Sequence, residues 1–270
     1  MRTVLAVAML WLLPHQAAWA WGQEGHSIVA EIAQQRLTPA AAAAVKALLG
    51  GDVSLASIAS WADDIRDERP DTYNWHFVDM PLDVARYDPA LYCKPDPNKG
   101  DCVINAIARA RATLGDRKAP KARRTEALMF LVHFVGDVHQ PLHTVADNEG
   151  ENTLHVSFFT DPTFKTREET NLHAVWDQGL IHTQFWDWGA YVRWLNTSWF
   201  PGKTIARLSA GTPVTWAEEA HKVAHDDACP GVTEGAALDQ AYIARVRPLL
   251  DQQLALAGLR LARLLNETLR

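Results

Sequence analysis

The 270-residue chain has few cysteines, no second long apolar run, and fewer basic than acidic side chains. After residue 13, no segment reaches the roughly 18 uninterrupted apolar residues of a membrane-spanning helix, so we expect no membrane anchor. With 26 Lys and Arg against 32 Asp and Glu, the net charge of -6 argues against a polyanionic partner unless bound cations reverse the local field. The absence of repeats, linkers and low-complexity tracts favours one globular domain.

The first residues have the layout of a secretory signal peptide. A positive residue, Arg2, precedes an apolar run over residues 4–13, and the small residues Ala18 and Ala20 follow. We therefore predict cleavage between Ala20 and Trp21, with export to the periplasm or out of the cell.

The three cysteines suit an oxidising compartment. Cys93 and Cys102 lie on either side of a short loop, "CKPDPNKGDC", and we expect them to pair. Cys229 is then left over, and its state is open.

Helical periodicity dominates the remaining chain and predicts an all-α class, with β signal confined to short pieces such as "TLHVSFF". One expected helix begins at the N-cap Thr38 and ends at Gly50. The others are expected from about Ser54 through "SLASIASWADDIR", over "VINAIARARATLG", over "RRTEALMFLVHFVGDVHQ", and at about 168–180, 215–226 and 238–269, the last interrupted near Pro248. We assign residues 1–20 to the leader and 21–270 to a single domain.

Metal-ligating side chains occur inside the most apolar of these segments. His133 and Asp137 are four residues apart, so they share one face of a helix. Pro141 should end or kink that helix and let His143 turn back toward the same cavity. A lone pair with this spacing is as readily a hydrogen-bonded core pair. The second copy, His173 and Asp177, favours a metal site.

Three more residues join this set: His76 in "WHFVD", Asp63 in "WADDIR" and His26 near the mature end. Together they exceed what one ion can use. Imidazole and carboxylate without thiolate is the ligand set of a hydrolytic zinc site rather than of a structural one.

At this point the motifs resemble those of a known family, the zinc-dependent, single-strand-specific nucleases of fungi and plants (the S1/P1 type). The resemblance covers nearly the whole mature chain and is carried by "WGQEGH", "SWADDIR", "WHFVD", "CV" before "NAI", "LVHFVGDVHQPLH" and "NLHAVWDQGL".

The resemblance implies three zinc ions per chain in a mainly helical fold shared with bacterial zinc phospholipases C. The first ion would be held by Asp63, His76, His133 and Asp137, with Asp137 bridging to the second. The second would take His26 and the free α-amino group and carbonyl oxygen of Trp21. The third would be bound by His143, His173 and Asp177. Leader removal would then complete the site, although Trp21 could also be a chance aromatic residue at the cut.

Three carboxylates around three dications leave a positive pocket, which reconciles an acidic protein with a nucleic-acid substrate. We expect the two close zinc ions to share a water whose pKa falls to about 7, giving a bridging hydroxide for attack on phosphorus. The resemblance implies cleavage of single-stranded DNA and RNA to 5′-phosphate products and activity on 3′-nucleotides, by a monomer.

Four further residues receive roles in this reading. Arg66 would stabilise charge on the phosphate, or be an ordinary surface cation. Asn152 matches a phosphate-contacting Asn of the family, although Glu151 replaces the usual second glycine before it. Phe77, which would otherwise be a core residue, could stack on a base whose edge bonds to Asp79. Asp63 could also orient the attacking water.

Two other functions fit the same ligand set. A zinc phospholipase C would share the fold and the metal site, and "WHFVD" and "HQPLH" favour the nuclease over it. A non-catalytic zinc-storage protein is the third interpretation.

Overall fold

The computed structural model describes residues 21–185 and 187–270, so the predicted signal peptide lies outside the described residues. The longer helices are listed here by label and bounds: α1 (Gln23–Gln34), α2 (Pro39–Leu49), α5 (Val103–Gly115), α6 (Lys121–Asp137), α10 (Trp188–Trp194), α12 (Pro213–Val223) and α13 (Gln240–Thr268). Between them lie short helical segments: η1 (Ala56–Ile58), α3 (Trp61–Asp64), η2 (Pro70–His76), α4 (Pro89–Tyr92), η3 (Pro141–Thr144), α7 (Asn148–Glu151), α8 (Leu172–Ala174), η4 (Val175–Gly179), α9 (Leu180–His182), η5 (Leu195–Trp199), α11 (Ile205–Leu208) and η6 (Ala224–Ala228). The all-α class is confirmed.

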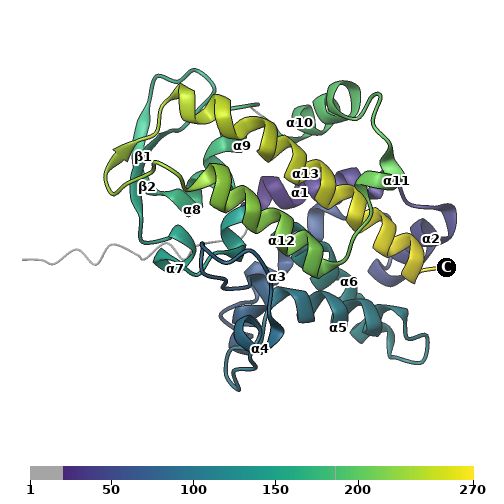
Figure 1. Ribbon diagram of the computed structural model, residues 1–270. Coiled ribbons are helices and arrows are strands. Elements are labelled where there is room, and N and C mark those ends of the chain that lie inside the picture. Colours follow the sequence, from purple (N-terminus) through teal and green to yellow (C-terminus); the bar gives the residue numbers. More distant parts are fainter. Residues whose placement is uncertain (1–20, 186) are drawn as a thin grey trace, which may run out of the picture.

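Three helices, α1, α6 and α13, form the centre of the molecule (Figure 1). In the second half of α6, every residue from Phe130 to Asp137 is buried, so all faces of the helix are covered. The apolar sequence of this segment predicts such burial. α1 and α13 approach so closely at Gly258 that a methyl group there would lie 2.4 Å from Cγ2 of Ile32. The polar side chains of α1 and α6 are therefore carried into a packed interior.

Several predicted helix boundaries are confirmed. The Thr38 hydroxyl accepts a hydrogen bond from the Ala41 amide at the start of α2, and Gly50 ends that helix with a left-handed φ of 81°. α5 and α6 occupy the segments expected for them, and α12 continues into η6. Cys93 and Cys102 form the expected disulfide, and Cys229 is a half-buried free thiol.

Two expected helices were wrong in their bounds, and a third expectation, a break near Pro248, was wrong as well. The stretch from Ser54 is broken into η1 and α3, because its backbone turns at Ala59 and Ser60 instead of continuing. Residues 167–171 form a strand, and helix begins only at Leu172, where the Asn171 side chain caps it.

Pro248 does not interrupt α13. The buried residues Val246 and Leu250 lie on either side of it, and packing on both sides holds the helix together despite one missing amide donor.

A small sheet lies at one end of the bundle (Figure 1). Its strand order is β2-β1-β3, with β1 (His155–Phe159) antiparallel to β2 (Arg167–Asn171) and parallel to β3 (Ala236–Ala237). The β prediction for "TLHVSFF" is confirmed. Among the described residues, no helix has both the length and the apolarity needed to cross a bilayer.

Candidate metal centre

Eight His and Asp side chains from seven elements meet in the interior, and each is at most 6% exposed. They are His26 (α1), Asp63 (α3), His76 (end of η2), His133 and Asp137 (α6), His143 (η3), His173 (α8) and Asp177 (η4). All eight had been selected from sequence. The structure brings them together in three groups that could each hold a metal ion.

The first group is centred on Asp137. Its Oδ2 atom lies 3.2 Å from both His76 Nδ1 and His133 Nε2, and those two nitrogens are 3.1 Å apart. Asp63 Oδ1 completes the group at 3.4 Å from His76 Nδ1 and 3.5 Å from His133 Nε2. His133 and Asp137 lie on one face of α6, as their four-residue spacing predicted, and Asp63 and His76 approach them from α3 and η2.

His26 lies beside this group, on the other oxygen of Asp137. Its Nε2 is 3.3 Å from Asp137 Oδ1, and its ring stacks on His133 with the centroids 3.9 Å apart. The two oxygens of Asp137 therefore face different imidazoles, which is the arrangement of a carboxylate that bridges two ions. Trp21 is fully buried next to it, where the indole Nε1 donates to the Gly136 carbonyl at 2.9 Å.

The third group consists of His143, His173 and Asp177. Nε2 of His143 is 3.8 Å from Asp177 Oδ1, and Nε2 of His173 is 3.4 Å from Asp177 Oδ2. His143 also lies 3.9 Å from Asp137 Oδ1, so this group adjoins the first. The turn at Pro141 returns His143 to the cavity, as expected.

Backbone carbonyls orient three of the imidazoles. Nδ1 of His133 lies 2.7 Å from Ala59 O, Nδ1 of His143 lies 2.8 Å from His76 O, and Nδ1 of His173 lies 2.5 Å from Gly150 O. When Nδ1 donates to the carbonyl, Nε2 is left unprotonated and faces the centre. This is the usual outer support of a metal-bound histidine.

Sequence reasoning missed Gln140. Its Nε2 donates to Asp177 Oδ1 at 2.7 Å, and its Oε1 accepts from the Leu142 amide, so the side chain holds both the third group and the turn. Its position just before Pro141, inside the motif that carries the metal ligands, could have indicated a supporting role for this polar residue.

The buried polar atoms of the centre fit a metal. Both nitrogens of His26, both oxygens of Asp137, Oδ1 of Asp63 and Nε2 of His76 are buried with no hydrogen-bond partner among the described residues. Unpaired groups of this kind carry a desolvation cost of about 1–3 kcal/mol each. A dication would satisfy several of these acceptors at once.

The pKa values indicate the same demand for positive charge. Burial lowers the pKa of His133, but Asp137 and Asp63 outweigh it and raise the pKa to about 10. Burial raises the pKa of Asp63, yet His133 and His76 hold it at about 2. Burial raises the pKa of Asp177 well above its ordinary value, and the hydrogen bond from Gln140 offsets this only in part. A bound dication would stabilise each carboxylate as an anion.

Phe77 and Asp79 lie at the edge of the centre. The Val78 amide donates to the His143 carbonyl and the Met80 amide to the Thr144 carbonyl, so this segment runs extended along η3. Val78 and Met80 are buried, and alternation places Phe77 and Asp79 together on the opposite side. Asp79 is solvent-accessible, and partial desolvation by the surrounding protein raises its pKa to about 6.

Arg66 also faces the centre. Its guanidinium is 3.8 Å from Asp63 Oδ1 and lies over the ring of Tyr73, 4.7 Å from the centroid. Burial, helped by the charges of His143 and Arg66, lowers the pKa of His173 to about 3.

Asn152 follows a loop of unusual backbone. Asn148, Glu149, Gly150 and Glu151 all have φ between 47° and 68°. This explains why a glycine is favoured where Glu151 stands. Nδ2 of Asn152 donates to the Glu149 carbonyl and lies 3.2 Å from His173 Nδ1, while its Oδ1 is buried without a partner.

Comparison with known proteins finds relatives along the whole described chain. The family model S1/P1 Nuclease matches residues 21–270. The chain is 34% identical to Endonuclease 2 of Arabidopsis thaliana, covering 98% of this chain and 97% of that protein. It is 31% identical to Nuclease P1 of Penicillium citrinum (92% and 97%) and 27% identical to Nuclease S1 of Aspergillus oryzae (97% and 96%).

Proposed function

The chain belongs to the S1/P1 nuclease family, and from this premise we propose that it is a zinc-dependent endonuclease. Its substrates are single-stranded DNA and RNA, which it hydrolyses to 5′-phosphate products, and 3′-nucleotides. The observation that carries the proposal is the convergence of eight buried His and Asp side chains, with their unpaired acceptor atoms, in a chain that matches this family throughout.

The ligands divide among three zinc ions. His76, His133 and Asp137, with the Asp63 carboxylate beside them, would hold the first. His26, Asp137 and the amine and carbonyl oxygen of Trp21 would hold the second, and the burial of Trp21 against Gly136 supports this assignment. His143, His173 and Asp177 would hold the third. When bound, zinc supplies Lewis-acid stabilisation of negative charge and lowers the pKa of water.

The reaction is attack of water on phosphorus with cleavage of the bond to the 3′ oxygen, which takes up a proton as it leaves. The Asp63 carboxylate is buried beside the metal positions and can orient the water by accepting a hydrogen bond from it, while the proton that the water loses is the one gained by the leaving 3′ oxygen. Arg66, within 3.8 Å of that carboxylate, places a positive charge where the phosphate gains negative charge. Nδ2 of Asn152 is oriented beside His173 and can donate to a phosphate oxygen.

Single-strand preference follows from Phe77 and Asp79. A base must leave its stack to lie on the Phe77 ring. This separation costs more free energy for a base in a duplex, which must also unpair, than for a base in a single strand. Asp79, on the same side of the segment, accepts hydrogen bonds from the base edge. The pair therefore binds an unpaired base beside the scissile phosphate.

Processing and export complete this proposal. Removal of residues 1–20 frees the Trp21 amine, and only an amine has a lone pair available for a metal. The mature enzyme is a monomer in the periplasm or outside the cell.

The test uses the processed chain. We expect three zinc ions by elemental analysis, release of 5′-phosphorylated products from single-stranded DNA and RNA, and loss and zinc-dependent return of activity after chelation. Phosphatidylcholine vesicles serve as the competing substrate, since a phospholipase C shares the metal ligands. Lipid cleavage without nucleotide release would overturn the proposal, and full nuclease activity in excess chelator would remove the metal from it.

A further inference from the structure

The connection between α5 and α6 carries a strong concentration of positive charge. Residues 109–124, here called the basic hairpin, contain seven Arg and Lys and a single acidic residue, Asp116. Its net charge is +6 in a chain of net charge -6, so all other residues together carry -12. The connection projects from the lower right of the molecule in Figure 1. Such asymmetry creates a local field that the overall charge conceals.

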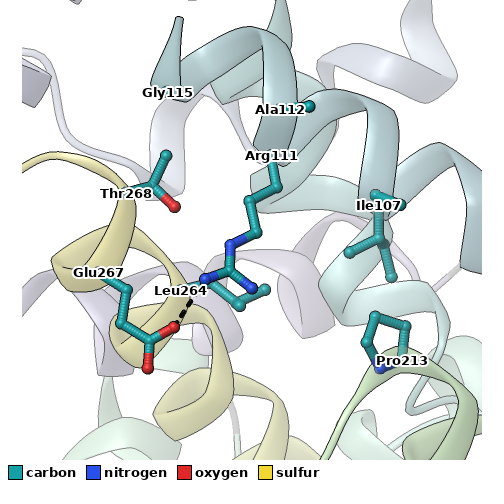
Figure 2. A pocket seen from close by; sticks show the side chains of 9 residues that line it. Ile107, Arg111, Ala112, Gly115, Pro213, Leu264, Glu267 and Thr268 are labelled. Atoms are coloured by element: carbon teal, nitrogen blue, oxygen red, sulfur yellow. Dashed lines mark hydrogen bonds and ion pairs between the residues drawn. The ribbon is translucent and has the colours of Figure 1, made fainter.

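Some of these cations are already engaged. Arg111 pairs with Glu267 at 2.8 Å across a separate groove of about 510 Å³ (Figure 2). Arg109 pairs with Asp101 at 2.6 Å, and Arg124 donates to the Leu114 carbonyl, which braces the connection. Arg117 donates to the backbone carbonyl of Arg270. These four contacts hold the hairpin in place.

Three cations remain available at the surface, and we call them the outer cations: Lys118, Lys121 and Arg123. All three are exposed. Lys118 and Lys121 have no ion-pair partner among the described residues, and Arg123 has one contact, at 3.6 Å from Glu126.

Two of the outer cations, Lys121 and Arg123, lie where positive charge lowers the stability of a helix. Lys121, Arg123 and Arg124 occupy the first turn of α6, which has no acidic residue. The positive end of the helix dipole favours Asp and Glu there and disfavours Lys and Arg. Neighbouring like charges repel each other as well. Lys118 and Lys121 have no ion-pair partner among the described residues, and Arg123 has only the contact with Glu126 at 3.6 Å, so this positive cluster indicates an external partner of negative charge.

The hairpin is connected to the metal centre along α6. His133 is twelve residues beyond Lys121, which corresponds to about 18 Å of helix. Between them lies a cavity of about 140 Å³ lined by Arg69, Trp75, Arg109 and Arg123 among others. The Arg109 guanidinium lies over the Trp75 ring, 4.6 Å from the centroid, and Trp75 precedes the ligand His76. Glu126 also lines this cavity and pairs with Arg69, and Arg109 pairs with Asp101, so the cavity supplies an aromatic ring and balanced charge between the centre and the unpaired lysines of the hairpin.

We propose that the outer cations form an accessory site for the phosphate backbone of single-stranded nucleic acid, bound outside the metal centre. The site holds the part of a long strand that extends from the scissile bond, past Trp75, onto the hairpin. The separation from the centre fits the span of a few nucleotides, within the usual footprint of about 4–16 nucleotides. Short substrates cannot reach it. The proposal rests on the proposed nuclease function and adds a preference for polymers.

The test compares two triple variants of equal charge change. The first is Lys118→Glu, Lys121→Glu and Arg123→Glu. The control is Lys94→Glu, Lys165→Glu and Arg207→Glu, at three exposed positions elsewhere. For each, kcat/KM is measured with a 30-nucleotide single strand and with a dinucleotide over a range of salt concentrations.

In the first variant we expect kcat/KM for the long strand to fall at least about tenfold, with the dinucleotide changed by less than about twofold. The salt dependence of log kcat/KM should become shallower by about two, since three contacts each contribute about 0.7. The Tm should stay constant or rise, because Glu suits the first turn of α6. A variant that merely damaged the fold would lower both the Tm and dinucleotide cleavage.

Other results overturn the proposal. If kcat/KM for the long strand fell equally in the two triple variants, the effect would be due to the overall charge of the protein and not to a site on the hairpin. Retention of polymer cleavage by the first variant would refute the site while the nuclease function stood, whereas a wild-type protein that cleaves neither substrate would refute the nuclease function itself. Unchanged polymer kinetics, combined with lost binding to anionic lipid vesicles, would assign the hairpin to a membrane surface.

Discussion

Gly136 offers a direct test of the second metal position, because it lies between Trp21 and His26. A Cβ atom at Gly136 would be 2.8 Å from His26 Nδ1 and 3.1 Å from His26 Cε1. Normal contacts between such atoms are about 3.5–4.0 Å, so the His26 ring must move by roughly 0.5–1 Å in Gly136→Ala. Metal-ligand distances tolerate only about 0.2 Å. His26 would therefore lose its position as a ligand.

The stability change in Gly136→Ala has two opposing parts. Alanine favours a helix interior by about 1 kcal/mol relative to glycine. Overpacking of a buried site costs about 1–3 kcal/mol, so we expect net destabilisation of up to about 2 kcal/mol. Metal affinity should fall more clearly, by at least the 10–100-fold typical of altered support around a ligand.

Zinc content per chain is the assay, measured after dialysis against limiting zinc together with turnover of single-stranded DNA. We expect Gly136→Ala to retain two ions and little activity. Gly115→Ala is the matched control, since a Cβ there has only ordinary contact, 3.4 Å from the Thr268 methyl. Three ions, normal turnover and an increased Tm in Gly136→Ala would refute the reasoning.

Three shorter predictions concern the mature end and the base site. One residue added before Trp21 should remove the amine ligand and most activity while circular dichroism shows a preserved fold; normal turnover would exclude the amine. Phe77→Ala should weaken nucleotide binding by about 1–3 kcal/mol, measured by calorimetry, and an unchanged affinity would place Phe77 outside the site. The raised pKa of Asp79, about 6, means that its carboxylate becomes ionised and able to accept base hydrogen bonds as pH rises through 6. KM should therefore fall across that range in the wild type but not in Asp79→Asn, and equal profiles would contradict this role.

The two His-x-x-x-Asp pairs could be selected from the sequence because helical periodicity is local, whereas His26, Asp63 and His76 were selected from short motifs. Four-residue spacing places His133 and Asp137 on one face whatever surrounds them. The role of Gln140 was not predicted because it depends on a hydrogen bond to Asp177, 37 residues away. The predicted break at Pro248 was wrong for a similar reason, because packing along both halves of α13 outweighs the lost hydrogen bond.

The Ser54 and 168–180 segments show the same limit. Their apolar spacing is helical, yet the chain turns at Ala59, whose carbonyl must reach His133, and stays extended at 167–171 to pair with β1. Tertiary contacts override a weak local preference.

By itself the sequence determined the helical class, the disulfide and the set of residues that can bind metal, because periodicity, loop length and side-chain chemistry are properties of short segments. Only the tertiary structure decided which nitrogen of each histidine faces the centre, how Gln140 supports Asp177, and where the outer cations lie relative to the metal centre. These properties depend on distances between residues far apart in the chain, and packing sets such distances.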